Sequence, residues 1–229
     1  MKLFVAAIAA ICALAAQPRP TGSPKSSAPI DITGYWVAFV TEDWRFRMIT
    51  PRKGDYQAVP MTQEARKVAD AWDPTADETS GNQCKAYGAP ALMRVPARFH
   101  ISWQDDNTLK VESDAGMQTR FFRFQASPTS GERTWQGISV AEWQLPSSLK
   151  VATANLRAGY LRKNGVPYSE NAAVTEYYDV APLVGSGQAL LVTTIVDDPK
   201  YLAQPFITSS QFKKEADGSK WDPTPCTAR

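Results

Sequence analysis

The chain has 229 residues, of which 43% are hydrophobic, and it carries 25 Lys and Arg against 23 Asp and Glu, for a net charge of +2. This near-neutral balance, with no block or stripe of basic residues, argues against a nucleic acid or an anionic membrane surface as partner. The length fits one domain with a continuous hydrophobic core.

The first 16 residues have the pattern of a secretory signal peptide. Lys2 is their only charge, an apolar run extends from Leu3 to Leu14, and Ala13-Leu14-Ala15 supplies the small-x-small pattern of a cleavage site. The run is too short to span a bilayer, and no other segment is apolar and long enough to do so. We therefore expect a periplasmic or secreted protein with no integral membrane segment after signal cleavage.

Residues 17–30, rich in Pro, Ser and Lys, predict a flexible tether, and residues 31–229 predict a single β-barrel domain. In this domain apolar and polar residues alternate with the period of two that is typical of strands. Ten strands are predicted: 33–41, 44–50, 98–104, 108–114, 118–125, 134–144, 149–156, 173–180, 189–197 and 206–214. Turn residues between the third, fourth and fifth of them predict a three-stranded meander over residues 98–125.

One short helix interrupts the strands. Thr62 is its predicted N-cap, and Asp73-Pro74 is predicted to end it. Residues 73–96 and 157–171 show little pattern, and segments of this length in a compact domain are expected to form a lid, a plug or a pinned loop.

Short antiparallel strands in one domain favour a closed barrel, because closure leaves no unpaired edge. The predicted fold class is therefore all-β, an antiparallel barrel of about eight to ten strands with one short helix. A β-sandwich is the main alternative.

The first predicted strand contains Gly34-Tyr35-Trp36, which resembles the Gly-x-Trp motif at the start of the first strand of lipocalins. The resemblance implies a lipocalin-like (calycin-type) barrel in which the Trp closes the floor of a ligand-holding cavity. That family has an Arg packed on the Trp from the C-terminal end; here Lys213 and Lys214 lie in the last predicted strand.

A second stretch, with Cys84, Gly88, Pro90 and Met93 in a Cys-x-x-x-Gly-x-Pro-x-x-Met spacing, resembles a group of uncharacterised exported bacterial proteins. The resemblance continues with an acidic residue at Glu176 and an Asp-Pro turn at residues 198–199. It implies a lipocalin-like barrel outside the cytoplasm and implies no activity.

Two cysteines, Cys84 and Cys226, remain after the predicted leader is removed with Cys12. In an oxidising compartment an isolated pair predicts a disulfide, and two partly buried thiols are the alternative. Two cysteines and one histidine at wide spacing are not a recognisable metal site, and no Gly-rich phosphate loop is present. We expect neither a metal nor a cofactor.

Three residues are candidates for acid–base catalysis. His100, the only histidine, lies in a predicted strand and would be the natural proton carrier if it faced a polar lumen; facing outward, it would be a surface residue. Glu176 lies in an apolar strand that would raise its pKa in a pocket, with Tyr178 as electrophilic partner. The other interpretation of Glu176 is an outward carboxylate paired with a basic neighbour.

The candidate ligand-binding residues are aromatic or charged: Trp44, Arg45, Arg47, Trp103, Trp135 and Glu142. Alternation in the second predicted strand puts Arg45 and Arg47 on one face, where they would clamp a carboxylate or pair with neighbouring acids. Large rigid rings line apolar pockets, and they also fill ordinary β cores. Glu142 is either a buried acid or a surface partner of Lys150.

The leading hypothesis is an exported β-barrel protein that binds a small, largely apolar or aromatic molecule in its cavity. The alternative is a cofactor-independent lyase, isomerase or hydratase in the same barrel, with His100 or Glu176 as acid or base. A cell-envelope interaction module is a third possibility. Binding is favoured over catalysis, and the sequence leaves the ligand and the oligomeric state open.

Overall fold

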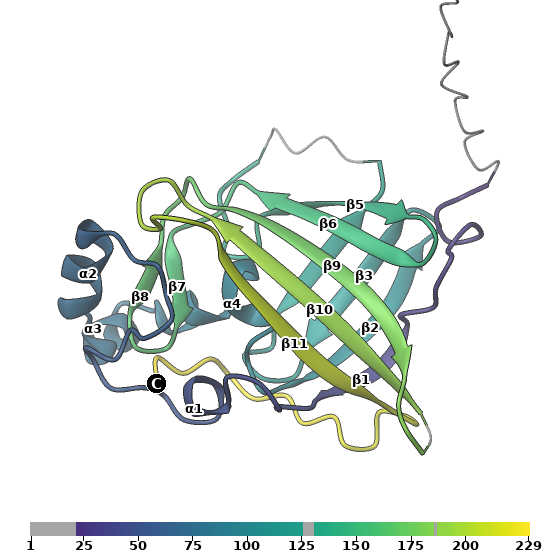
Figure 1. Ribbon diagram of the computed structural model, residues 1–229, viewed down its shortest axis with the longest axis horizontal. Coiled ribbons are helices and arrows are strands. Elements are labelled where there is room, and N and C mark those ends of the chain that lie inside the picture. Colours follow the sequence, from purple (N-terminus) through teal and green to yellow (C-terminus); the bar gives the residue numbers. More distant parts are fainter. Residues whose placement is uncertain (1–21, 126–130, 186) are drawn as a thin grey trace, which may run out of the picture.

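Nine strands close into one barrel in the computed structural model, which describes residues 22–125, 131–185 and 187–229. The helices and a separate hairpin gather at one end of the barrel, and the N-terminal segment lies at the other (Figure 1). The predicted leader, residues 1–16, lies outside the described residues. The barrel strands are β1 (Gly34–Ala38), β2 (Arg98–Asp105), β3 (Thr108–Ser113), β4 (Thr119–Arg123), β5 (Ile138–Gln144), β6 (Ser148–Ala154), β9 (Ala173–Pro182), β10 (Gln188–Asp197) and β11 (Phe206–Glu215).

The order around the barrel is β1-β11-β10-β9-β6-β5-β4-β3-β2. Neighbours are antiparallel except β4 and β5, which pair in parallel through Phe122 and Ser139. The all-β barrel and the meander of β2, β3 and β4 confirm the sequence prediction, and each barrel strand corresponds to one of the predicted strands.

The predicted strand 44–50 is wrong. Asp43 adopts a left-handed conformation with φ of 52°, and α1 (Trp44–Arg47) follows it. The alternation of aromatic and Arg residues was the signal for a strand. In the helix it instead leaves Trp44 exposed and buries Arg47, so the two arginines of this segment have different environments.

The predicted helix is α2 (Gln63–Asp70), and the Thr62 hydroxyl accepts a hydrogen bond from the Ala65 amide at 3.2 Å, as expected of an N-cap. Asp73 caps a further helix, α3 (Pro74–Thr79). The patternless residues 73–96 also contain a 3-10 helix, η1 (Gln83–Tyr87), and α4 (Ala89–Leu92).

The second patternless segment forms a hairpin of β7 (Gly159–Arg162) and β8 (Val166–Tyr168). Its turn depends on Gly165, which has φ of 84°; a Cβ there would lie 2.3 Å from Trp72. Both segments, expected to form a lid, a plug or a pinned loop, contain short helices or a hairpin and build the cap over one end of the barrel.

Inward-facing side chains pack into one hydrophobic cluster inside the barrel. Trp36 is fully buried there and donates from Nε1 to the Ile32 carbonyl at 2.9 Å. The Lys214 ammonium lies 4.9 Å from the centre of the Trp36 ring, so it is the basic group that packs on this tryptophan. The largest fully buried members of the cluster are Trp36, Tyr178, Phe99, Phe122, Phe212, Ile32, Leu92, Ile101, Leu109 and Leu149.

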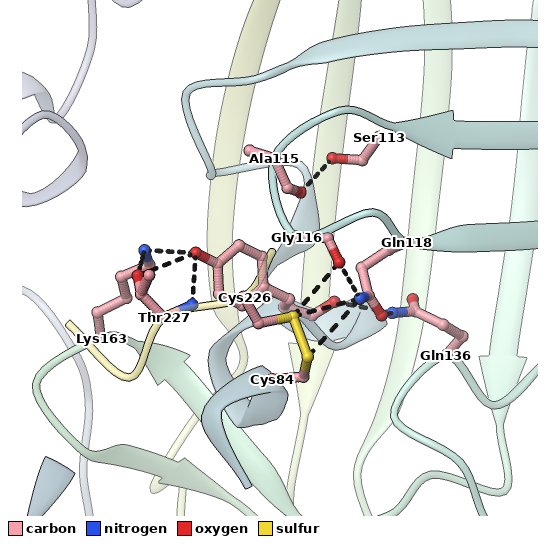
Figure 2. Close-up of a disulfide and its surroundings, with 10 residues drawn as sticks. Cys84, Ser113, Ala115, Gly116, Gln118, Gln136, Lys163, Cys226 and Thr227 are labelled. Atoms are coloured by element: carbon pink, nitrogen blue, oxygen red, sulfur yellow. Dashed lines mark hydrogen bonds between the residues drawn. A yellow bond between two sulfur atoms is a disulfide. The ribbon is translucent and has the colours of Figure 1, made fainter. Parts of the chain in front are cut away.

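The predicted disulfide joins Cys84 of η1 to Cys226, with a Cα–Cα distance of 5.1 Å (Figure 2). It holds residues 224–229 against η1 and the turn between β3 and β4, where the Gly116 amide donates to the Thr224 carbonyl. Of the helices in the described ranges, none is long and apolar enough to cross a bilayer.

Candidate functional site

His100 and Glu176 lie on opposite sides of the barrel wall. His100 faces outward, stacks on Tyr35 with ring centres 4.3 Å apart, and has its Nδ1 3.3 Å from Glu112. Glu176 points into the barrel and is fully buried. The structure therefore does not bring these two candidates together.

Glu176 forms a two-pronged ion pair with Arg120 inside the barrel, with nitrogen–oxygen distances of 2.9 and 2.6 Å. The Tyr178 hydroxyl donates to the same carboxylate, and Arg120 also donates to Thr153. Burial lowers the pKa of Arg120, but the adjacent Glu176 carboxylate outweighs it and holds that pKa above its ordinary value. Burial raises the pKa of Tyr178. The pair is electrically balanced and sealed from solvent, which fits a structural role better than proton transfer.

Three of the predicted ligand-binding residues lie on the surface, and the two charged ones have local partners. Arg45 of α1 pairs with Asp55 at 2.7 Å, Glu142 pairs with Lys150 at 2.9 Å, and Trp44 is exposed. The structure therefore does not bring these three residues together around a common ligand site.

The two remaining tryptophans lie apart. Trp135 packs under the Arg157 guanidinium at 4.6 Å. Trp103 joins Phe124 and Trp143 at the N-terminal end of the barrel and lines a cavity of ≈ 440 Å³ there. The protein's own residues cover this cavity, because residues 25–33 form its other wall. Trp143 also donates from Nε1 to the Pro24 carbonyl.

Arg47 is the predicted residue that leads to a charged cavity. A space of ≈ 450 Å³, here named the arginine cavity, lies outside the barrel at its capped end. Its walls come from five segments that are distant in sequence: residues 46–51, residues 86–96, Ala115 in the turn between β3 and β4, β7 with Lys163, and residues 224–229.

Three buried guanidinium groups line this cavity. The exposed fractions are 7% for Arg47, 6% for Arg94 and 4% for Arg162. Arg47 pairs with Glu42 and donates from Nε to the Arg94 carbonyl at 2.9 Å, and Arg94 pairs with Asp43 at 3.0 Å. Arg162 donates to the Gln57 carbonyl and, in the part of the chain that the structure describes, has no carboxylate within 4 Å.

Donor capacity is left over on all three arginines. Among the described residues, Nη2 of each guanidinium and Nε of Arg162 have no hydrogen-bond partner. Burial lowers the pKa of Arg47 and of Arg94, and burial together with the charge of Arg94 lowers the pKa of Arg162 to about 10. Positive charge that is desolvated and incompletely paired is unfavourable unless an anion joins it.

Aromatic rings pack against two of the three guanidiniums. Arg162 lies 4.2 Å from the centre of the Phe46 ring, and Phe206 lies between Arg94 and Arg162 at 5.7 and 5.9 Å. Such stacking fixes a planar guanidinium while leaving its edge free to donate.

The opposite wall of the cavity is polar. Lys163 donates to the Tyr87 hydroxyl at 2.6 Å, and both contact Thr227 (Figure 2). Burial raises the pKa of Tyr87, but the hydrogen bonds from Lys163 and Thr227 outweigh it and lower that pKa. Lys163 therefore adds a fourth cationic group to the cavity.

No family model, curated protein or solved structure matches this chain. Within the described ranges, no group of three or more His, Cys, Asp or Glu side chains is placed to hold a metal ion. The site must therefore be interpreted from its own geometry.

Sequence reasoning missed Arg94 and Arg162. Both lie in the segments without strand or helix pattern, and Arg162 becomes buried only because the β7-β8 hairpin folds onto α2 and Phe206. Their apolar neighbours in the sequence could have indicated burial, since Arg94 stands between Met93 and Val95 and Arg162 follows Leu161.

Proposed function

We propose that the protein is an exported binding protein for a small anionic molecule with an apolar part, held in the arginine cavity. The observation that carries the proposal is the set of three buried, incompletely paired guanidiniums that belong to residues lining one space. Arg and carboxylate or phosphate groups match geometrically, because the guanidinium fork donates two parallel hydrogen bonds.

The size and composition of the cavity support this function. Its volume lies in the range of small-molecule sites, and Phe46, Met48 and Leu161 give it apolar surface beside the charges. The barrel interior is a less suitable place for a ligand, because its inward-facing side chains already pack against one another. Export is supported by the signal-peptide pattern of residues 1–16 and by the disulfide, which persists in oxidising compartments.

Isothermal titration calorimetry of the purified protein tests the proposal with benzoate and phenyl phosphate, using benzyl alcohol as the neutral probe. We expect at least one anion to bind with a dissociation constant between about 1 µM and 1 mM, and the alcohol not to bind. Arg162→Met should weaken anion binding by at least tenfold. Arg123→Met, an exposed arginine of β4 away from the cavity, is the matched control and should leave binding unchanged.

Two results would contradict the proposal. One is equal affinity for benzyl alcohol and the anions, which would remove the role of charge. The other is unchanged anion binding in Arg162→Met, which would place the ligand elsewhere.

A further inference from the structure

We infer that the ligand of the arginine cavity is a linear amphiphile, an anionic carboxylate or phosphate headgroup on an unbranched apolar chain. This inference rests on the proposed function and specifies its ligand class. The apolar chain of this ligand would extend from the arginines into a second cavity that adjoins the first.

The second cavity has a volume of ≈ 520 Å³ and lies between the end of β1 and residues 96–98. The two cavities share four lining residues, so they adjoin each other. The shared residues are Met48, Pro96, Ala115 and Thr224.

Polarity changes along two stretches of chain that border both cavities. In one stretch Arg47 lines the arginine cavity and the next residue, Met48, lines both. In the other stretch Arg94 lines the first cavity and Ala97 lines the second. The arginine cavity thus holds three guanidiniums, whereas the second cavity holds one, that of Arg98, beside several small apolar side chains.

The second cavity is apolar over most of its lining, with Val37, Ala38 and Val40 on the β1 side. Its charged groups are at least partly engaged already: the Arg98 side chain pairs with Glu215 at 3.0 Å, and the Asp114 carboxylate accepts from the Arg98 amide at 2.8 Å. Asp222 is the remaining acid of its lining. A headgroup would thus find its best complement among the arginines rather than here.

Apolar side chains at the junction are left uncovered. Met48 is 58% exposed and its neighbour Ile49 is 67% exposed. A hydrocarbon chain that crosses Met48 on its way to the second cavity would remove this surface from water, which is the favourable direction for apolar area.

A chain-length series separates this inference from the proposed function. Calorimetry is run with butyrate, octanoate and dodecanoate, and with the matching alkyl phosphates, all below their micelle concentrations. We expect affinity to rise by up to about fourfold per added methylene until the second cavity is filled, since each buried methylene contributes a roughly constant increment. The headgroup series with the tighter binding identifies whether carboxylate or phosphate is preferred.

Two substitutions test whether the apolar chain of the ligand lies in the second cavity. Met48→Asp and Ala38→Asp put a carboxylate at the junction and in the second cavity, and each should weaken dodecanoate at least tenfold. Ala38, which does not line the arginine cavity, is the position at which butyrate binding should stay unchanged. Arg162→Met should weaken both ligands. Val184→Asp, at an exposed apolar residue of the β9-β10 turn, is the control for added charge and should change neither. Circular dichroism of each variant verifies folding.

Affinity that is independent of chain length would overturn the inference and leave the proposed function standing. Chain-length dependence that survives both Met48→Asp and Ala38→Asp would also overturn it. Failure of every anion to bind would overturn the proposed function itself.

Discussion

The molecule buries arginine in two ways. Inside the barrel Arg120 meets Glu176 in a balanced pair, with Tyr178 and Thr153 as further partners and only its Nε left without a partner in the described ranges. In the arginine cavity three arginines share Glu42 and Asp43, and Arg162 has no acid of its own among the described residues. The balanced pair serves the fold, whereas the unbalanced cluster has the composition of a binding site.

Removing the acid of the balanced pair should have the largest effect. Glu176→Gln leaves Arg120 charged and unpaired in the barrel, and we expect the free energy of unfolding to fall by about 3–5 kcal/mol. Urea denaturation followed by circular dichroism measures it. Replacing both partners by Met is the companion experiment, and it should cost much less than the single change. A loss of under 1 kcal/mol in Glu176→Gln would show that the pair is not needed.

Breaking the disulfide should affect both regions. Cys84→Ser with Cys226→Ser removes a link across 142 residues, and we expect a loss of about 2–5 kcal/mol in unfolding free energy. Because residues 224–229 form a wall of the arginine cavity, benzoate should also bind more weakly to the variant at a temperature where it is still folded. Unchanged binding would mean that the wall is held without the link.

Removing a charged side chain from the arginine cavity should affect the free energy of unfolding in the opposite direction to Glu176→Gln. Arg162→Met removes a desolvated charge, so the ligand-free protein should keep its unfolding free energy or gain up to about 2 kcal/mol. Denaturation of this variant beside Glu176→Gln makes the comparison directly. A loss above 2 kcal/mol would assign Arg162 to the fold instead of the ligand.

The smallest expected effect is a pH dependence of anion affinity. The pKa of Arg162 is lowered to about 10, so its charge is present at neutral pH and is lost as the pH rises through that value. Ionisation of Tyr87, whose pKa is also lowered, adds negative charge and acts in the same direction. Affinity for benzoate should fall as the pH rises from 7, by about tenfold at pH 11. Calorimetry across this range tests the trend, and a constant affinity up to pH 11 would contradict it.

The barrel was predictable from sequence because strand alternation is a local signal. Period two identified each barrel strand, and Thr62 marked the start of α2. The same signal failed at residues 44–50, because a one-turn helix after Asp43 retains the alternating letters of a strand. Alternation also does not say which face is inside, so the sequence left open that Glu176 points inward and His100 outward.

The arginine cavity was not predictable in the same way. Its residues come from five separate segments, and Arg94 and Arg162 acquire their burial from tertiary packing on Phe206. Of the predicted site residues only Arg47 lies in it. Charged residues that are buried under a cap of short helices leave no periodic pattern in the sequence from which their burial could be predicted.

The position of residues 224–229 has a consequence for when the protein becomes competent. Chains are synthesised from the N-terminus, and this wall of the cavity follows every barrel strand in that order. The arginine cavity is therefore completed last, when Cys226 becomes available to pair with Cys84. A chain that ended before Cys226 would have every barrel strand but an incomplete cavity.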